Sequence, residues 1–248
     1  MRSTNPVLTG RGFARINPDA LDRTGAPQAD VTSLESRPSS APMSIDDVII
    51  KTAGLFAVLV AVGAFAWRAE NPAFALIGVV AGLVLAMVNS FSKKVRPAFV
   101  IAYAAAQGLA LGTISRIYNE AYSGIVGQAV IGTLCAFGGI LVAYRSGKIR
   151  VTPKFTRIMV GALIGYLVFG IITMFTGFPG GSTGLLIAVA GVALATFFLV
   201  LDFDQIERTI AAGAPQQESW RMAFGLMVTI VWLYMEVLRL LSILRNSD

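Results

Sequence analysis

Apolar residues dominate the chain from about residue 44 onward, in seven long runs separated by short polar stretches. Each run has about 18–25 residues, the length that an α-helix needs to cross the hydrocarbon core of a bilayer. The pattern therefore predicts an all-α integral membrane protein, a bundle of seven transmembrane helices. The predicted spans are residues 47–68, 72–91, 97–118, 124–144, 155–176, 184–206 and 220–243.

The first 43 residues are rich in Pro, Ser, Gly, Asn and Arg and have no apolar period. Such a composition buries too little apolar surface to fold, so residues 1–43 are predicted to be a disordered cytoplasmic tail. No apolar stretch follows the early arginines, so the tail is not a signal peptide. A Pro-rich docking peptide is the alternative. Residues 44–246 form the predicted seven-helix domain, which begins with Ser44 and Asp47 as a helix cap.

Cationic residues concentrate in the loops on one side of the predicted bundle. Because Lys and Arg favour the cytoplasmic face, this bias predicts a cytoplasmic N-terminus and an external C-terminus. The cations on the predicted cytoplasmic side are Lys93, Lys94, Arg96, Arg145, Lys148, Arg150, Lys154, Arg157, Arg208 and Arg221. The other side has Arg68, Arg116 and Arg245.

Composition narrows the chemistry, because the chain is 55% hydrophobic and 14% charged, with no His and a single Cys. The missing His excludes a Ser-His-Asp triad, a His-ligated zinc site and an imidazole pH switch. Cys135 alone excludes an internal disulfide or a multi-Cys metal site. We therefore expect no enzyme and no cofactor. The net charge of +6 fits a basic cytoplasmic face rather than a nucleic-acid partner, so the lipid bilayer is the expected surrounding.

Three predicted helices carry glycines four residues apart, which let two helix backbones approach closely in lipid. The alternative is that Gly is simply common in membrane helices. Gln107 lies in the middle of the third predicted helix, where its amide either joins helices or lines a pore. The glycine pairs are Gly78 with Gly82, Gly108 with Gly112, and Gly161 with Gly165.

Charged residues inside the bilayer are costly and are candidates for function. Glu236 lies well inside the last predicted helix, and Arg239 shares its face three residues on. Two interpretations are open: a structural ion pair, or a carboxylate that lines an ion path. Asp202 and Asp204 end the sixth predicted helix on faces about 200° apart, so one of them can point into the bundle. The alternative is that both are ordinary interfacial acids at a helix end.

If Asp202 or Asp204 lies next to Glu236, two carboxylates share a site where both cannot ionise cheaply. They would then share a proton and titrate as a pair. A hard cation such as calcium, which prefers oxygen ligands, would compete with that proton. A hairpin turning at residues 214–215 places Glu236 about 10 Å deeper than Asp202 at helical rise. The acids meet only if residues 216–224 first run along the membrane surface.

The sixth predicted helix ends with LDFDQI, and the seventh contains LYMEVLRL. These segments resemble Tyr-Asp-x-x-x-Ile and Leu-Tyr-Leu-Asp-Phe-Ile-Asn-Leu of the Bax inhibitor-1 family, also called the transmembrane BAX inhibitor motif family. Residues 1–7, 106–112 and 147–155 resemble in particular its bacterial Bax inhibitor-1/YccA-like branch. Glu236 stands where the family has Asp, and Arg239 where it has Asn.

The resemblance implies a pH-sensitive calcium leak, in which acids of the last two helices sense protons. By position, Asp202 matches the first acid and Glu236 the second, with Asp204 as the substitute for the first. Arg239 is then a charge partner, and Asp202 with Glu236 would bind calcium weakly and transiently. The resemblance also implies a multi-pass protein of the cell (inner or plasma) membrane. The alternative function is a non-conducting regulator that binds a membrane-protein partner, such as a protease or stress complex. A transporter ranks behind both, because we find no internal repeat.

Overall fold

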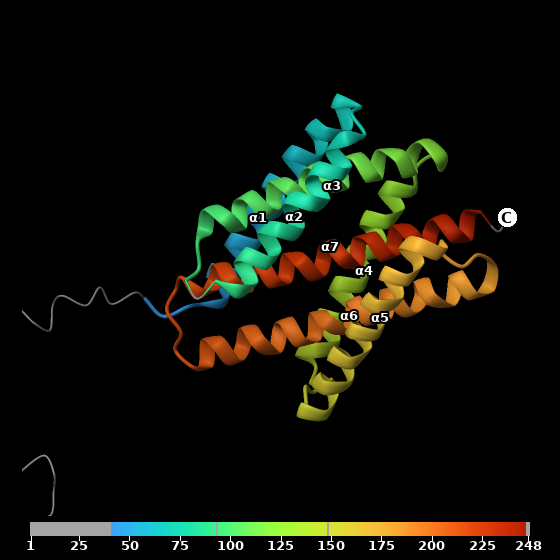
Figure 1. Cartoon of the computed structure of the whole chain (residues 1–248). Helices are drawn as coiled ribbons and strands as arrows, with labels where there is room; N and C mark the ends of the chain where they lie inside the picture. Colours follow the sequence, from blue (N-terminus) through green and yellow to red (C-terminus); the bar gives the residue numbers. More distant parts are fainter. Residues whose placement is uncertain (1–40, 93, 148, 247–248) are drawn as a thin grey trace, which may run out of the picture. The chain divides into compact units, whose positions relative to one another are not determined.

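Figure 1 shows the computed structural model, which describes residues 41–92, 94–147 and 149–246. In this part of the chain there are seven helices and no strand, and all seven are long and apolar enough to cross a membrane. The predicted seven-helix membrane fold is therefore confirmed. The helices are α1 (Ile45–Ala69), α2 (Ala73–Phe91), α3 (Pro97–Ala121), α4 (Ile125–Arg145), α5 (Pro153–Thr176), α6 (Gly181–Ala211) and α7 (Glu218–Arg245).

The helix ends follow local signals in the sequence. The Ser44 hydroxyl accepts a hydrogen bond from the Asp47 backbone N–H, and the Asp47 carboxylate accepts one from the Ser44 N–H. This is the predicted cap of α1, and the two bonds satisfy backbone donors that the first turn leaves free. Helix α6 runs to Ala211, five residues past the predicted end. The prediction followed the apolar residues, and the last turns of this helix are polar.

The chain segment before α1 is joined to the turn between α6 and α7. The Met43 N–H donates to the Ala214 carbonyl at 2.9 Å, and the Gln216 N–H donates to the Ala41 carbonyl at 2.9 Å. Met43 itself is only 3% exposed. These contacts begin three residues before the predicted boundary at residue 44. The rest of the predicted tail, residues 1–40, lies outside the described residues.

Helix α7 is the centre of the bundle. It packs against α1, α3, α4 and α6, and in Figure 1 its red ribbon runs between the first three helices and α6, with α4 crossing it. It contributes residues to both hydrophobic cores, one shared mainly with α4 and α6 and the other with α1 and α3. At the other extreme, α5 has no buried residue. The bundle therefore has a helix with four packed neighbours and one with no buried residue.

Glycines bring α1 and α2 close to α3, as the sequence predicts. A Cβ on Gly78 of α2 would lie 2.5 Å from the backbone nitrogen of Ala110, and one on Gly108 would lie 2.7 Å from the carbonyl oxygen of Leu59. A Cβ on Gly112 would collide with the backbone of Gly63. The third predicted pair behaves differently, because nothing lies within 4 Å of a Cβ on Gly161 or Gly165 of α5.

We expect Gly78→Ala to destabilise the protein by roughly 1–3 kcal/mol, the usual cost of overpacking, because the new methyl group would force α2 away from α3. Thermal unfolding in detergent measures the effect. The matched control is Gly139→Ala on α4, where nothing lies within 4 Å of the added Cβ. Equal unfolding temperatures for the two variants would show that this close approach does not hold α2 in place.

Candidate functional site

Glu236 is buried inside the bundle, with its residue surface only 2% exposed. Three donors from two helices surround its carboxylate. The Tyr166 hydroxyl of α5 donates to Oε2 at 2.7 Å, and the Trp232 indole N–H donates to Oε1 at 3.0 Å. Arg239 Nη1 lies 3.2 Å from Oε2 and also donates to the Tyr166 oxygen at 3.1 Å. Both oxygens therefore have donors, and the charge has a counter-ion.

A glycine of α6 makes room for this cluster. A Cβ on Gly191 would lie 2.5 Å from Glu236 Oε2 and 2.5 Å from the Tyr166 hydroxyl oxygen. On the other side, the Arg239 guanidinium lies 5.1 Å from the centre of the Phe178 ring, where a cation–π contact adds to its stabilisation. Helices α5, α6 and α7 thus meet at one ionic contact.

This arrangement has the features of a structural ion pair, which is one of the two interpretations that the sequence leaves open. The Glu236 carboxylate accepts hydrogen bonds from three side chains, and one of them, Arg239, carries the opposite charge. It joins α5 to α7 at a level where α5 has few other contacts. Tyr166 and Gly191 were not found from the sequence, whereas Trp232 lies four residues before Glu236 on the same helix face and was open to inference.

Asp202 lies in a different environment, on the face of α6 that meets α7. Its carboxyl faces Thr229, and a Cβ on Gly225 would lie 3.9 Å from its Oδ1. The other oxygen, Oδ2, is buried and has no hydrogen-bond partner among the described residues. No Lys or Arg among the described residues forms an ion pair with this carboxyl.

Asp204 points away from Asp202, as the helix geometry predicts. It forms an ion pair with Arg208, one turn further along α6, with Arg208 Nε 2.6 Å from Oδ2. The Arg208 side chain is 64% exposed, so this pair belongs to the polar end of the helix. Of the two acids at the end of α6, Asp202 is therefore the one directed into the bundle.

The structure places Asp202 and Glu236 at different levels of the contact between α6 and α7, whereas the hypothesis of a directly paired sensor needs them side by side. Asp202 faces α7 at the level of Thr229, seven residues or about 10 Å of helical rise before Glu236. Glu236 faces α6 at Gly191, eleven residues or about 16 Å before Asp202. The reason is the one that the sequence indicates: α7 begins at Glu218, directly after the turn, and no segment runs along the surface first.

The separation bears on calcium as well. A single ion cannot contact both Asp202 and Glu236 in this arrangement. Among residues 41–92, 94–147 and 149–246, no group of three or more Asp, Glu or Cys side chains is placed to hold a metal ion.

A second polar cluster lies at the first turn of α7, and the sequence did not predict it. The Lys51 ammonium of α1 donates to the Ser219 hydroxyl, which in turn donates to the Gln216 carbonyl. Lys51 also lies 5.4 Å from the Trp220 ring centre, and the Gln216 side-chain amide donates to Asp47 at 2.7 Å. Ser219 is fully buried. The cluster clamps the start of α1 to the start of α7.

Gln107 contacts the glycine pair of α2. A Cβ on Gly82 would lie 2.6 Å from its Nε2 atom, so the amide fills the space that this glycine leaves. The Tyr103 hydroxyl, one turn before it, is its hydrogen-bond partner. These contacts are those of a residue that joins α2 and α3, the first of the two roles that the sequence suggests.

Comparison with known proteins adds one finding. The sequence model of the family described as Bax inhibitor 1 like matches residues 5–246, which is nearly the whole chain. A comparison with curated proteins finds no match. The family match covers the Asp202 and Glu236 segments. All seven helices of the described residues are long and apolar enough to cross a membrane. The chain is therefore a multi-pass membrane protein that belongs to the Bax inhibitor 1 like family.

Proposed function

We propose that the protein is a proton-sensitive cation leak with calcium as the ion, and that Asp202 is the group that binds the proton. The observation that carries the proposal is the buried Oδ2 of Asp202, which has no hydrogen-bond partner. A carboxylate inside a membrane is costly unless donors or a counter-ion stabilise it. The proposal includes the cell membrane as the location and a cytoplasmic N-terminus, from the distribution of cations in the loops.

The two buried acids have different roles in this proposal. Glu236 already has three donors and Arg239, so its charge is neutralised within the protein. Asp202 has Thr229 and Gly225 as its neighbours on α7 and no ion pair. A proton and a hard cation would therefore compete for Asp202, because each neutralises the same charge. At low pH the proton occupies the carboxyl and the leak falls; at high pH the cation has access and the leak rises.

The alternative is a non-conducting regulator that binds another membrane protein. The observation that favours it is α5, which has no buried residue and leaves space around Gly161 and Gly165. A pair of glycines four residues apart on an open helix suits close contact with a partner helix in the membrane. Ion flux through the purified protein separates the two functions, because a regulator needs no flux.

We expect purified protein in calcium-loaded liposomes to release calcium several-fold faster at about pH 8 than at about pH 5, because protonation of the acid blocks the cation site. A calcium-sensitive dye outside the vesicles measures the release. Asp202→Asn should remove the pH dependence. Asp204→Asn is the matched control, since Asp204 pairs with Arg208 at the end of the helix and should leave the pH dependence intact.

Absence of flux at every pH, from protein that thermal unfolding shows to be folded, would reject the leak and favour the regulator. Flux that keeps its pH dependence in Asp202→Asn would reject the role of Asp202 while leaving the leak in place. The two parts of the proposal can thus fail separately.

We expect Glu236→Gln to lower the free energy of unfolding by roughly 1–3 kcal/mol, because it leaves the Arg239 guanidinium without its counter-ion. The pH profile of the remaining flux should be unchanged. The double variant Glu236→Gln, Arg239→Gln removes both charges and should recover part of the lost stability. A stable Glu236→Gln protein with an altered pH profile would instead make Glu236 the proton-binding group.

A further inference from the structure

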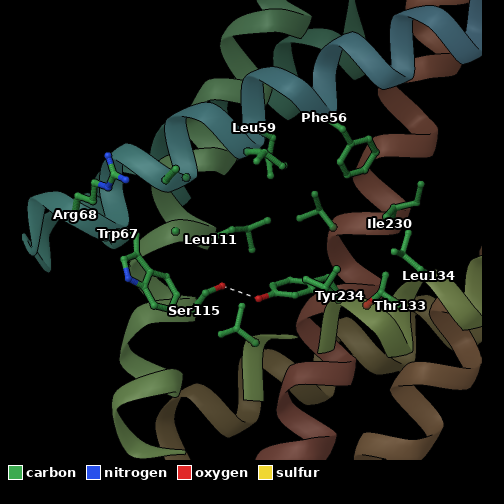
Figure 2. A pocket seen from close by; sticks show the side chains of 17 residues that line it. Phe56, Leu59, Trp67, Arg68, Leu111, Ser115, Thr133, Leu134, Ile230 and Tyr234 are labelled. Carbon is green, nitrogen blue, oxygen red and sulfur yellow. Dashed lines mark hydrogen bonds between the residues drawn. The ribbon is translucent and has the colours of Figure 1, made fainter. Parts of the chain in front are cut away.

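A cavity of about 660 Å³ lies between α1, α3, α4 and α7, away from both acids. Figure 2 shows it with Trp67 and Arg68 at one end and Phe56 and Ile230 at the other. Its walls include Leu111 of α3 and Leu134 of α4. The cavity therefore follows α1 through the membrane-spanning part of the bundle and ends at the last turn of that helix.

The lining is almost entirely apolar, and its three hydroxyl groups are hydrogen-bonded. The Ser115 and Tyr234 hydroxyls are hydrogen-bonded at 2.7 Å, as the dashed line in Figure 2 shows. The Thr133 hydroxyl donates to the Ala129 carbonyl in its own helix. A buried water needs about two to four polar partners, which this lining does not supply. An apolar occupant fits the cavity, whereas water and ions do not.

The end of the cavity at Trp67 and Arg68 has the chemistry of a membrane interface. Trp and Arg at the end of a membrane-spanning helix lie at the level of the lipid headgroups. Arg68 is exposed and forms no ion pair among the described residues. The nearest acid in sequence, Glu70, pairs with Arg116 at 3.2 Å. A positive charge that has no ion pair among the described residues thus lies at one end of an apolar cavity.

We propose that this cavity binds one acyl chain of an anionic phospholipid, whose phosphate contacts Arg68. A volume of about 660 Å³ has room for about 20 groups of the size of a water molecule, at roughly 30 Å³ each. That is the size of one ordinary fatty acyl chain. The cation at the cavity's end complements a phosphate group, and the apolar walls complement the hydrocarbon.

The preference for this site over bulk lipid has two sources. Burial of apolar surface gives no advantage inside a bilayer, since lipid tails are as apolar as the cavity wall. An empty cavity, however, forfeits the dispersion contacts of its lining, and a chain that fills it restores them. Arg68 adds selection among headgroups, because a basic residue at the membrane surface attracts anionic lipid. The bound chain would lie between α1 and α4, beside Tyr234.

Native mass spectrometry of the intact protein, exchanged into detergent with phosphatidylglycerol or phosphatidylcholine of identical chains, tests the proposal. We expect one retained phosphatidylglycerol and a preference over phosphatidylcholine of about fivefold, the effect of one basic residue at a membrane surface. Arg68→Gln should abolish this preference. Val130→Trp, which fills the cavity from α4, should weaken retention of both lipids by roughly tenfold or more.

The matched control is Ile131→Trp, one residue further along α4, which is 63% exposed and does not line the cavity. It should retain phosphatidylglycerol as the unchanged protein does. Equal retention by Val130→Trp and Ile131→Trp would overturn the proposal. Equal binding of the two lipids to the unchanged protein would also overturn the proposal. The same holds if the unchanged protein is a dimer without bound lipid and Val130→Trp dissociates that dimer.

Discussion

The bundle depends on the contacts of one helix, α7. In a lipid bilayer the burial of apolar side chains does not by itself stabilise such contacts. Inside lipid, helices associate through close packing and polar contacts. Helix α7 supplies polar contacts to three neighbours: Ser219 to α1, Tyr234 to α3 and Glu236 to α5. Its apolar faces join both hydrophobic cores. Four helices, α1, α3, α4 and α6, pack directly on α7, whereas α2 packs on α3 and α5 on α6.

The two buried acids show that depth in a membrane does not by itself define a sensor. Glu236 lies well inside α7, but its carboxylate is hydrogen-bonded and forms an ion pair with Arg239. Asp202 lies nearer the end of its helix, yet one of its oxygens has no partner. The difference between them is in the donors around them, and a sequence search for intramembrane carboxylates treats the two alike. This difference between the two carboxyl groups supports the proposal that Asp202 is the one that binds the proton.

The sequence predicts the fold well, because the length of an apolar run is set by the thickness of the bilayer. It also predicts the Ser44–Asp47 cap and the opposite directions of Asp202 and Asp204, which are local properties of one helix. It predicts less about the site. The register between α6 and α7 depends on where the turn ends, and the contact of Lys51 with Ser219 joins residues 168 positions apart. Such contacts follow from the packing of whole helices.

The contacts between the start of α1 and the turn after α6 have a consequence for the synthesis and membrane insertion of the protein. Lys51 contacts the Gln216 carbonyl, which lies 165 residues later in the chain. At a synthesis rate of about 5–20 residues per second, α1 waits roughly 10–30 s before the residues that hold its first turn exist. During that interval Lys51 and Met43 lack their native partners. The first helix to enter the membrane is thus among the last to be secured, and a chaperone or an insertase has that time to act on it.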